Sequence, residues 1–450
     1  MPNLANPTAA GASWRRHGLL LLLTLLYADA FIGRQIMAVM IEPIKLEFGA
    51  SDTAMGLISG LAFAAVFALF GLSAGQLADR VSRTKLLAGC ALLWSVTTLL
   101  CGFATGFYML IAARMLVAVA EAPITAASVS LISDLYPHHR RAFAISCFSS
   151  APTFAAIIAM SVGAWLVEQY GWRSGFMMVA APAILIALVF SFFIREPGRG
   201  TWDTPISVAP KTQGLRATLK ALWQNKTFRL LILSSAVTTM GANAYGMWNA
   251  TFLVRSHGLE LQQAGMLAGF IGGGSAAIGM LFSGWFADHL ISRNRNWQLR
   301  LPQIGHIFGI IALLAYLLWP SGIMFHIGSL PVPSAMLWCA LNGFFSVWWV
   351  GPCFSFITQL IPPDRRAIAI ACQTVMITLL GIGVGPFAVG LISDSLVASL
   401  GSESLRYALL FCCLTTIISV MLLLRIALQQ AQTEESQDNS APGEALPGNS

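Results

Sequence analysis

The sequence predicts an all-α integral membrane protein with twelve transmembrane helices in two pseudo-symmetric bundles of six. Three observations lead to this prediction. The chain of 450 residues is 56% hydrophobic and only 10% charged, whereas soluble domains carry about 25% charged residues. It contains a series of apolar stretches of membrane-spanning length. Finally, two polar loop motifs of its first half recur in its second half.

The apolar stretches are interpreted as helices. A helix needs about 20 apolar residues to cross a bilayer, and these stretches are continuous, without the alternation of barrel strands. Arg15 and Arg16 precede the first stretch, which is long enough to span, so we do not expect a cleavable signal peptide. The stretches lie near 17–40, 53–77, 86–105, 108–133, 143–167, 173–194, 228–254, 264–287, 301–320, 334–359, 367–392 and 406–426.

The distribution of Lys and Arg predicts the orientation. With the N-terminus in the cytoplasm, the cytoplasmic stretches hold 20 of the 26 basic residues, the external loops hold four, and two lie inside helices. The four external ones are Lys45, Arg173, Arg255 and Arg406. We therefore expect both termini to be cytoplasmic, in a bacterial inner membrane. The net charge of +7 follows from this topology and gives no indication of nucleic acid binding.

A polar stretch divides the chain. Residues 195–227 are rich in Pro, Thr, Lys and Arg, and we expect a cytoplasmic linker there. The N-terminal six-helix bundle then occupies 1–194 and the C-terminal bundle 228–429. Residues 430–450 are rich in Gln, Glu, Ser, Pro and Gly, a composition that predicts a disordered cytoplasmic tail.

The two halves share loop motifs. Gly75-Gln-Leu-Ala-Asp79-Arg80-Val-Ser-Arg83-Thr-Lys85 follows the second stretch, and Gly284-Trp-Phe-Ala-Asp288 follows the eighth. Leu135-Tyr-Pro137-His-His-Arg140-Arg141 and Leu360-Ile-Pro362-Pro-Asp-Arg365-Arg366 form a second pair. Matched loops at equivalent positions indicate duplication, and parallel repeats of this kind build many secondary transporters.

The loop from Gly75 to Lys85 resembles the signature loop of the major facilitator superfamily. It differs at Ser82, where that family usually has Gly, and at Thr84, where a basic residue is frequent. The resemblance implies a central cavity lined by the first, fourth, seventh and tenth helices. It also implies a cytoplasmic latch between the halves, the alternative being charges that only follow the orientation rule. The expected latch residues are Gly75, Asp79, Arg80, Arg83 and Asp288.

The first third of the chain resembles the Spinster-like branch of that superfamily. The segments that carry this resemblance are Gly33-Arg34-Gln-Ile-Met-Ala-Val, Glu42-Pro-Ile-Lys45, Ser51-Asp52-Thr-Ala-Met-Gly56-Leu-Ile-Ser-Gly60 and Glu121-Ala. The branch usually has Asp at the position of Gly33. Here Asp29 lies four residues earlier, on the same helical face. The resemblance implies lipid-like substrates, such as lysophospholipid or sphingoid species.

Four charged residues lie inside apolar stretches of the first half: Asp29, Arg34, Arg114 and Glu121. Charge at membrane depth is costly and is mostly found where it faces a pore, a partner or a substrate. Both carboxylates are expected near the midplane, with Arg34 and Arg114 roughly 7 and 10 Å further outward. We predict that Glu121 and Asp29 form the proton-coupling centre and that Arg34 and Arg114 bind an anionic group. The alternative is a structural ion-pair network between the first and fourth helices.

The equivalent helices of the second half are polar but uncharged. Aromatic rings together with amides suit an amphipathic ligand, and the alternative for the rings is packing or anchoring at the membrane interface. The predicted substrate-binding residues here are Asn243, Tyr245, Trp248, Asn249, Asn342 and Trp348, and Trp349 is adjacent to them.

Other classes of function have no support in the sequence. The eight cysteines have no metal-ligand spacing, and no nucleotide-binding loop or soluble catalytic domain is visible. We therefore predict no metal site and no cofactor, and a protein that is not an enzyme. His306 is a single histidine in the ninth stretch, expected to pack or to form local hydrogen bonds.

The sequence favours a secondary active transporter. The expected substrate is a small amphipathic or lipid-like anionic solute, moved by alternating access, coupled to protons, by a monomer in the lipid bilayer. One alternative is an uptake symporter for a polar organic acid, although more basic residues would be expected on the seventh and tenth helices. From a different class, the chain could be a membrane sensor that binds ligand without transport.

Overall fold

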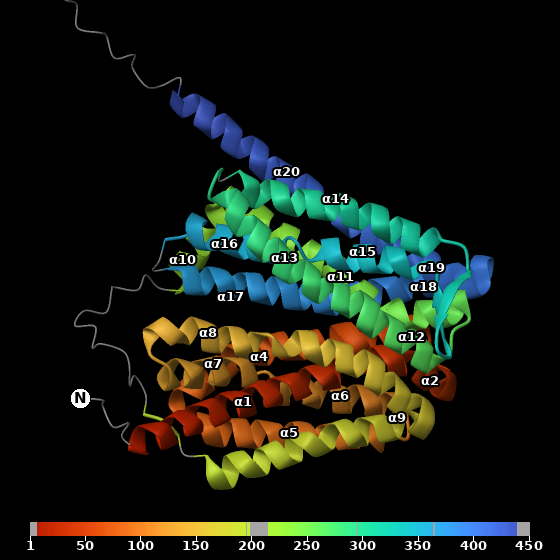
Figure 1. Cartoon of the computed structure of the whole chain (residues 1–450), viewed down its shortest axis with the longest axis horizontal. Coiled ribbons are helices and arrows are strands. Elements are labelled where there is room, and N and C mark those ends of the chain that lie inside the picture. Colours follow the sequence, from red (N-terminus) through yellow and green to blue (C-terminus); the bar gives the residue numbers. More distant parts are fainter. Residues whose placement is uncertain (1–6, 195, 199–214, 295, 363–364, 439–450) are drawn as a thin grey trace, which may run out of the picture.

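The computed structural model describes residues 7–194, 196–198, 215–294, 296–362 and 365–438. Figure 1 shows two groups of long helices side by side, the first half in red to yellow and the second in green to blue. The first half contains α1 (Pro7–Gln35), α2 (Met37–Phe48), α3 (Asp52–Gly56), η1 (Leu57–Leu61), α4 (Ala62–Arg80), α5 (Arg83–Gly102), α6 (Phe107–Glu121), α7 (Ile124–Leu135), α8 (His138–Ser149) and α9 (Ala151–Phe193). The predicted all-α fold with two bundles is confirmed.

The second half contains the remaining elements. They are α10 (Leu215–Gln224), α11 (Lys226–His257), α12 (Leu261–Leu267), η2 (Ala268–Gly273), α13 (Gly274–Ile291), α14 (Trp297–Leu318), β1 (Ile323–Ile327), β2 (Leu330–Pro333), α15 (Met336–Ser346), α16 (Val350–Leu360), α17 (Arg366–Met376), η4 (Ile377–Val384), α18 (Gly385–Leu400), η5 (Gly401–Glu403), α19 (Ser404–Ala408) and α20 (Leu410–Asp438). A small antiparallel hairpin of β1 and β2, which was not predicted, lies in the loop between α14 and α15.

Ten apolar segments of the described chain are long enough to cross a bilayer. One of them, Phe143–Phe193, contains two helical arms because α9 turns at Gly171, whose φ of 80° favours glycine. The helix α11, of 32 residues, provides a further span. Together these correspond to the twelve predicted helices.

The predicted linker and tail are partly helical. The linker region contains α10, and α11 already begins at Lys226. The last helix α20 continues past the predicted boundary at 429 to Asp438. Residues 199–214 and 439–450, where the rest of the linker and tail were predicted, lie outside the described residues.

Short polar side chains define several helix starts. The hydroxyl of Ser51 accepts a hydrogen bond from the Ala54 amide at the start of α3, and Asn225 does the same for Phe228 in α11. Ser82, the residue that replaces the usual family glycine, caps α5 by accepting from the Lys85 amide. Side-chain oxygens at this position satisfy amides that have no partner within the helix.

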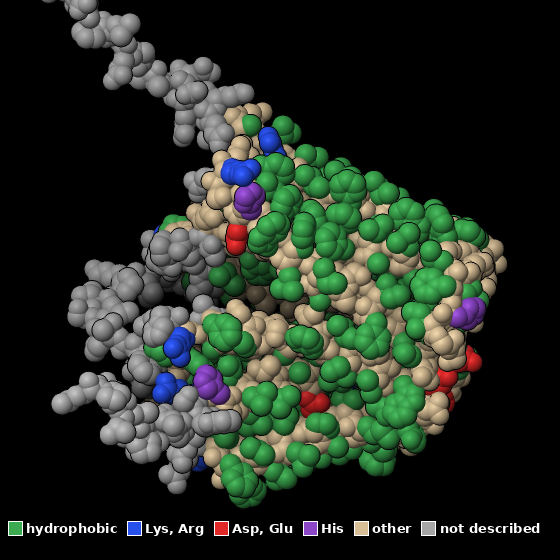
Figure 2. Space-filling view, in the orientation of Figure 1, with side chains coloured by type: hydrophobic (Ala, Val, Ile, Leu, Met, Phe, Trp, Pro, Cys, Tyr) green, Lys and Arg blue, Asp and Glu red, His purple; other side chains and the backbone are tan. Residues whose placement is uncertain are grey.

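The outer surface suits contact with lipid. Figure 2 shows hydrophobic side chains over most of the visible face, with most of the charged side chains near its two ends. Large apolar side chains such as Leu281 and Phe193 are each 78% exposed. An apolar surface of this extent is not found on soluble monomers and fits the interior of a bilayer.

The two ends of the molecule differ. At one end, where α4 finishes at Arg80 and α5 starts at Arg83, exposed Lys and Arg side chains gather and a hollow opens between the halves (Figure 2). We call this the basic end. At the other end, where α3 starts at Asp52 and α11 finishes at His257, the halves are in contact. We call this the far end.

Glycines allow close contact between the halves toward the far end. A Cβ atom added to Gly60 in η1 would lie 2.7 Å from the carbonyl oxygen of Gly383 in η4. A Cβ atom added to Gly265 in α12 would lie still closer to the Met160 carbonyl oxygen of α9. Small residues let helix backbones approach closely in this way. The two halves therefore meet backbone to backbone on both sides of their interface.

Candidate functional site

Two interrupted helices position the buried charges of the first half. The first span is broken at Ile36, between α1 and α2, directly after Arg34 and Gln35. The fourth span is broken between α6 and α7, directly after Glu121. Pro123 lies in that break and has no amide hydrogen to continue the helix. Arg34 and Glu121 thus each lie beside a break in their span.

Arg34 and Glu121 form an ion pair. The Nε atom of Arg34 donates to Oε2 of Glu121 over 2.5 Å, and the side chains are 16% and 0% exposed. The sequence predicted a separate guanidinium layer outward of the carboxylates. The direct contact arises because helical side chains point toward the helix N-terminus, which in the first span is toward the carboxylates. The second oxygen of Glu121 is buried without a hydrogen-bond partner.

Arg114 is fixed differently. It is 2% exposed, and its Nη1 donates to the backbone carbonyl of Gly33 over 3.0 Å. This bond ties the fourth span to the first, beside the break. Arg114 therefore has a positioning contact between the two spans. Its role in anion binding stays a prediction.

Both guanidinium groups lie beside aromatic rings. The guanidinium carbon of Arg34 lies 5.0 to 5.2 Å from the ring centres of Phe31, Phe63 and Phe67. That of Arg114 lies 5.7 Å from the same Phe63 ring. Cations are attracted to ring faces at such distances, and more strongly when water is excluded. The rings thus stabilise positive charge inside an apolar bundle.

Asp29 lies near the same cluster. It is 6% exposed, one of its oxygens is buried without a hydrogen-bond partner, and it is within electrostatic range of Glu121. A side chain at Gly33, the position where the resemblance led us to expect Asp, would place its Cβ 3.3 Å from the indole of Trp94. Trp94 therefore leaves little room for a larger side chain at this position.

A cavity of about 250 Å³ is lined mainly by the second half. It extends from Gln35 and Met160 of the first half to His306 of α14 and Thr416 of α20. Among the described residues, none of those that line it is Asp, Glu, Lys or Arg. Its wall is made mainly of small apolar side chains and glycines, with several uncharged polar groups.

Three predicted ligand-binding residues line this cavity: Tyr245, Asn249 and Asn342. The hydroxyl of Tyr245 lies 3.2 Å from the Cys339 sulfur, and Asn249 accepts a hydrogen bond of 2.7 Å from the Tyr316 hydroxyl. The Tyr245 hydroxyl and the Asn249 amide oxygen are therefore already engaged inside the bundle.

The other three predicted residues are not among the lining residues. Asn243 donates to the Thr239 carbonyl of its own helix. Trp248 is buried and donates to the Pro386 carbonyl of α18. Trp348 packs among aromatic rings that include Phe282 and Phe344. These two tryptophans have the packing role that the sequence left open as the alternative.

The predicted latch residues belong to α4, α5 and α13. Arg83 is 2% exposed and bonds within the first half, to Asp134 of α7 and to Glu196. Arg80 and Asp288 are exposed. Gly75 and Asp79 lie in α4, but their side chains are outside the described part of the structure. In this conformation Arg83 therefore supports its own bundle.

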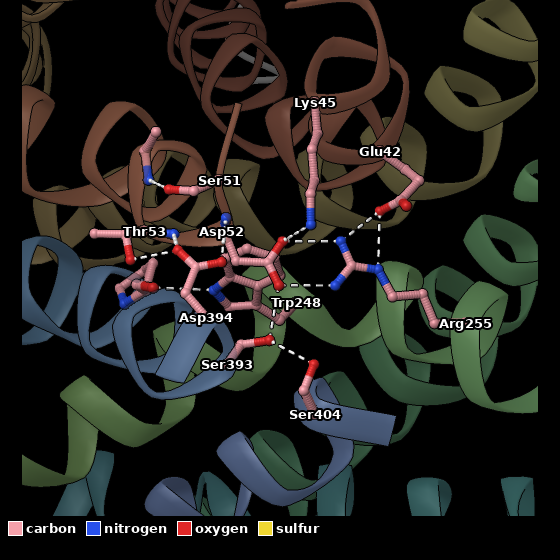
Figure 3. A network of polar contacts seen from close by, with 12 residues as sticks. Glu42, Lys45, Ser51, Asp52, Thr53, Trp248, Arg255, Ser393, Asp394 and Ser404 are labelled. Atoms are coloured by element: carbon pink, nitrogen blue, oxygen red, sulfur yellow. Dashed lines mark hydrogen bonds and ion pairs between the residues drawn. The ribbon is translucent and has the colours of Figure 1, made fainter. Parts of the chain in front are cut away.

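A polar network closes the far end (Figure 3). Arg255 of the second half donates two hydrogen bonds to Asp52 and two to Glu42, both of the first half. Asp52 also accepts from Lys45 and from Ser393. All of these donors converge on one carboxylate with no solvent exposure.

Asp394 extends this network. Its two carboxylate oxygens accept hydrogen bonds from the amides of Asp52 and Thr53, and from the Thr53 hydroxyl. A residue of α18 thereby caps the N-terminus of α3 in the other half, a favourable position for a carboxylate. We call Glu42, Lys45, Asp52, Arg255 and Asp394 the far-end network.

The sequence prediction did not identify this network as functional. One signal was available, because Lys45 and Arg255 are two of only four basic residues expected in external loops. An external basic residue that departs from the orientation rule needs a reason, and a carboxylate partner is one.

The chain is similar to known membrane transporters. The sequence profile of the Major Facilitator Superfamily matches residues 23–386. An MFS-type efflux pump of Mycolicibacterium smegmatis is 28% identical, with 88% of both chains covered. The sphingosine-1-phosphate transporter SPNS2 of Danio rerio is 23% identical over 88% of this chain and 81% of its own.

A solved structure gives a further match. A bacterial homologue of the human lysosomal transporter Spinster, in an inward-facing and unoccupied conformation, superposes with a TM-score of 0.83. It is 25% identical and covers 93% of this chain and 98% of its own. The loop motifs and the fold thus agree with these matches. The chain belongs to the major facilitator superfamily of membrane transporters, in its Spinster-like branch.

Proposed function

We propose that the protein is a secondary active transporter for a small amphipathic or lipid-like anion, driven by protons through alternating access. The observation that carries this proposal is the buried ion pair between Arg34 and Glu121. Arg34 is the more exposed partner and is next in sequence to Gln35, which lines the cavity. An anionic group that enters the site competes with Glu121 for the same guanidinium.

This competition couples the solute to a proton. While Glu121 is ionised, it remains paired with the Arg34 guanidinium and repels an approaching anion. When Glu121 accepts a proton, the guanidinium becomes available and its charge is no longer compensated. Anion binding at Arg34 and proton binding at Glu121 therefore favour each other, and such linkage is reciprocal. Asp29, within range of Glu121, is the second proposed proton acceptor.

Alternating access requires the two ends of the molecule to open and close in turn. We propose that the basic end is cytoplasmic, in a bacterial inner membrane, as the Lys and Arg distribution predicts. The conformation is then open to the cytoplasm and closed outside by the far-end network. Transport requires that this network break while the loops at the basic end come together.

The second half supplies space for the rest of the solute. Its cavity combines small apolar residues with Tyr245, Asn249 and Asn342, a lining that suits a molecule with both apolar and polar parts. The Danio rerio relative, named for sphingosine-1-phosphate, supports an anion of this type. We propose single-chain lipid phosphates as the first candidates.

The test is transport in proteoliposomes with an imposed proton gradient. Wild type is expected to accumulate a lysolipid phosphate above its equilibrium level. Glu121→Gln is expected to lose accumulation but to retain exchange of labelled for unlabelled solute, since the neutral amide imitates the protonated state. Glu47→Gln, which alters an ion pair with Arg173 at the far end, is the matched control. Uphill transport by Glu121→Gln would overturn proton coupling through this residue.

One observation favours a second candidate, a polar hydroxylated organic acid. Uncharged hydrogen-bonding groups line the cavity, and they suit hydroxyl groups as well as a lipid backbone. Competition by galactonate against the lysolipid distinguishes the two candidates. A sensor would bind ligand without exchange, so the exchange measurement also tests that alternative.

A further inference from the structure

His306 occupies an unusual position in the cavity of the second half. It belongs to α14, its side chain is 2% exposed, and it is one of the residues that line the cavity. Thr238 of α11 lines the same part of the wall. The proton-coupling scheme described above uses neither residue.

The hydroxyl groups around His306 lie closer to one another than to the His306 ring. Thr238 donates to the Ser419 hydroxyl over 2.7 Å, and Ser234 lies 2.7 Å from the same hydroxyl. By contrast, Nε2 of His306 lies 3.3 Å from the Thr238 oxygen and 3.4 Å from the Ser419 oxygen. Good N–H···O bonds measure about 2.7–3.2 Å. The hydroxyl groups bond mainly to one another, and the ring nitrogen keeps hydrogen-bonding capacity.

The uncharged lining around His306 favours a neutral imidazole. No carboxylate lies among the described residues of the cavity lining, so a protonated imidazole there would have no counter-charge and would be costly. A neutral imidazole offers one donor and one acceptor. It is therefore suited to an uncharged partner such as a hydroxyl group.

We propose that His306 and Thr238 form a second polar subsite that recognises a hydroxyl group of the transported anion. Asn249 and Tyr245 are already engaged with Tyr316 and Cys339, whereas the two contacts of His306 Nε2 measure 3.3 and 3.4 Å. The inference rests on the proposed function, because the same solute must place its charge at Arg34. The hydroxyl can belong to a lysolipid or to a hydroxy acid.

The test compares two pairs of ligands on the purified protein. Lysophosphatidate is compared with its deoxy analogue, which lacks only the glycerol hydroxyl, and galactonate with its terminal deoxy analogue. Wild type is expected to prefer the hydroxylated member of one pair by about fivefold, the usual value of one hydrogen bond. The pair that shows the preference identifies the source of the hydroxyl.

Variants then assign the preference to the subsite. His306→Phe and, independently, Thr238→Val should abolish the preference while the deoxy analogue binds as before. Gln303→Leu is the control, since Gln303 is buried on the same helix and is not among the lining residues. The inference is overturned if wild type binds both members of each pair equally, or if the preference survives in both variants. Failure of wild type to bind any of the four ligands would overturn the proposed function, and this inference with it.

Discussion

Asp52 and Arg255 join the two halves of the protein through two hydrogen bonds of 2.8 and 2.9 Å. Asp52 is fully buried in this contact, and the residues are 203 positions apart in the chain. Removal of one partner from a buried, hydrogen-bonded ion pair costs about 3–5 kcal/mol. The pair therefore has a large influence on whether the far end stays closed.

Asp52→Asn should shift the protein toward a conformation open at the far end. The amide leaves Arg255 and Lys45 without their shared carboxylate, so the closed state loses stability relative to the open one. The measurement is the distance between spin labels at Tyr108 and Ile323, which are 87% and 58% exposed. Cys147 and Cys372 must first be replaced by Ser, because the other cysteines are buried. Glu47→Gln should leave the distance unchanged, and an unchanged distance in Asp52→Asn would contradict the prediction.

Arg34→Lys should weaken binding of the anionic solute although the charge is kept. Lysine lacks the planar group that donates from Nε and packs against Phe31, Phe63 and Phe67. We expect a loss of about 1–3 kcal/mol, or roughly fivefold to 150-fold in Kd, measured by titration calorimetry. Arg173→Lys, at a guanidinium 4.2 Å from the Trp172 ring at the far end, should bind normally. Equal affinity of Arg34→Lys and wild type would remove Arg34 from the site.

Gly60→Ala should destabilise the closed far end. The new Cβ would meet the carbonyl oxygens of Gly383 and Ile382 at 2.7 and 2.9 Å, and backbone atoms cannot move aside cheaply. We expect a cost of about 1–3 kcal/mol, visible as a lower melting temperature and a longer spin-label distance. Gly71→Ala has open space and should gain up to about 1 kcal/mol from helix propensity. The same response in both variants would argue against contact at Gly60.

Stability at acid pH should depend on Glu196. Burial alone would raise the pKa of this carboxyl, but hydrogen bonds from Ser82 and Arg83 hold its pKa below the ordinary 4.5. Because the pKa is lower in the folded state, the carboxylate stabilises the fold at neutral pH, and this contribution disappears as the pH falls through the folded-state pKa. Glu196→Gln should therefore melt earlier than wild type at neutral pH, with a difference that shrinks in acid. A difference independent of pH would exclude this linkage.

Several features could be predicted because they depend on short stretches of sequence. The spans follow from local hydropathy, and the duplication follows from motifs such as Gly75–Lys85 and its counterpart at Asp288. Ser82 caps its helix through a contact three residues away. Burial of Asp29, Arg114 and Glu121 inside the bundle is likewise confirmed.

Other features depend on which way a side chain points. The sequence placed Arg34 in a layer apart from Glu121, yet the two are in direct contact because the long side chain extends back along its helix. Trp248 and Trp348 lie on the helices expected to line the cavity, but both face neighbouring helices. Helix rotation is set by packing against neighbours, and one helix alone does not determine it.

By itself, the sequence determined the membrane fold, the family and the two spans that carry buried charge, because each depends on composition or on residues that are contiguous in the chain. Only the tertiary structure decided that Glu121 forms an ion pair with Arg34, that Asp52 forms one with Arg255 and that His306 lines a cavity. These contacts join residues on separate helices, at distances set by how two bundles pack. For the same reason, the proposed coupling and hydroxyl recognition belong to the packed pair of bundles, and no single helix contains either of them.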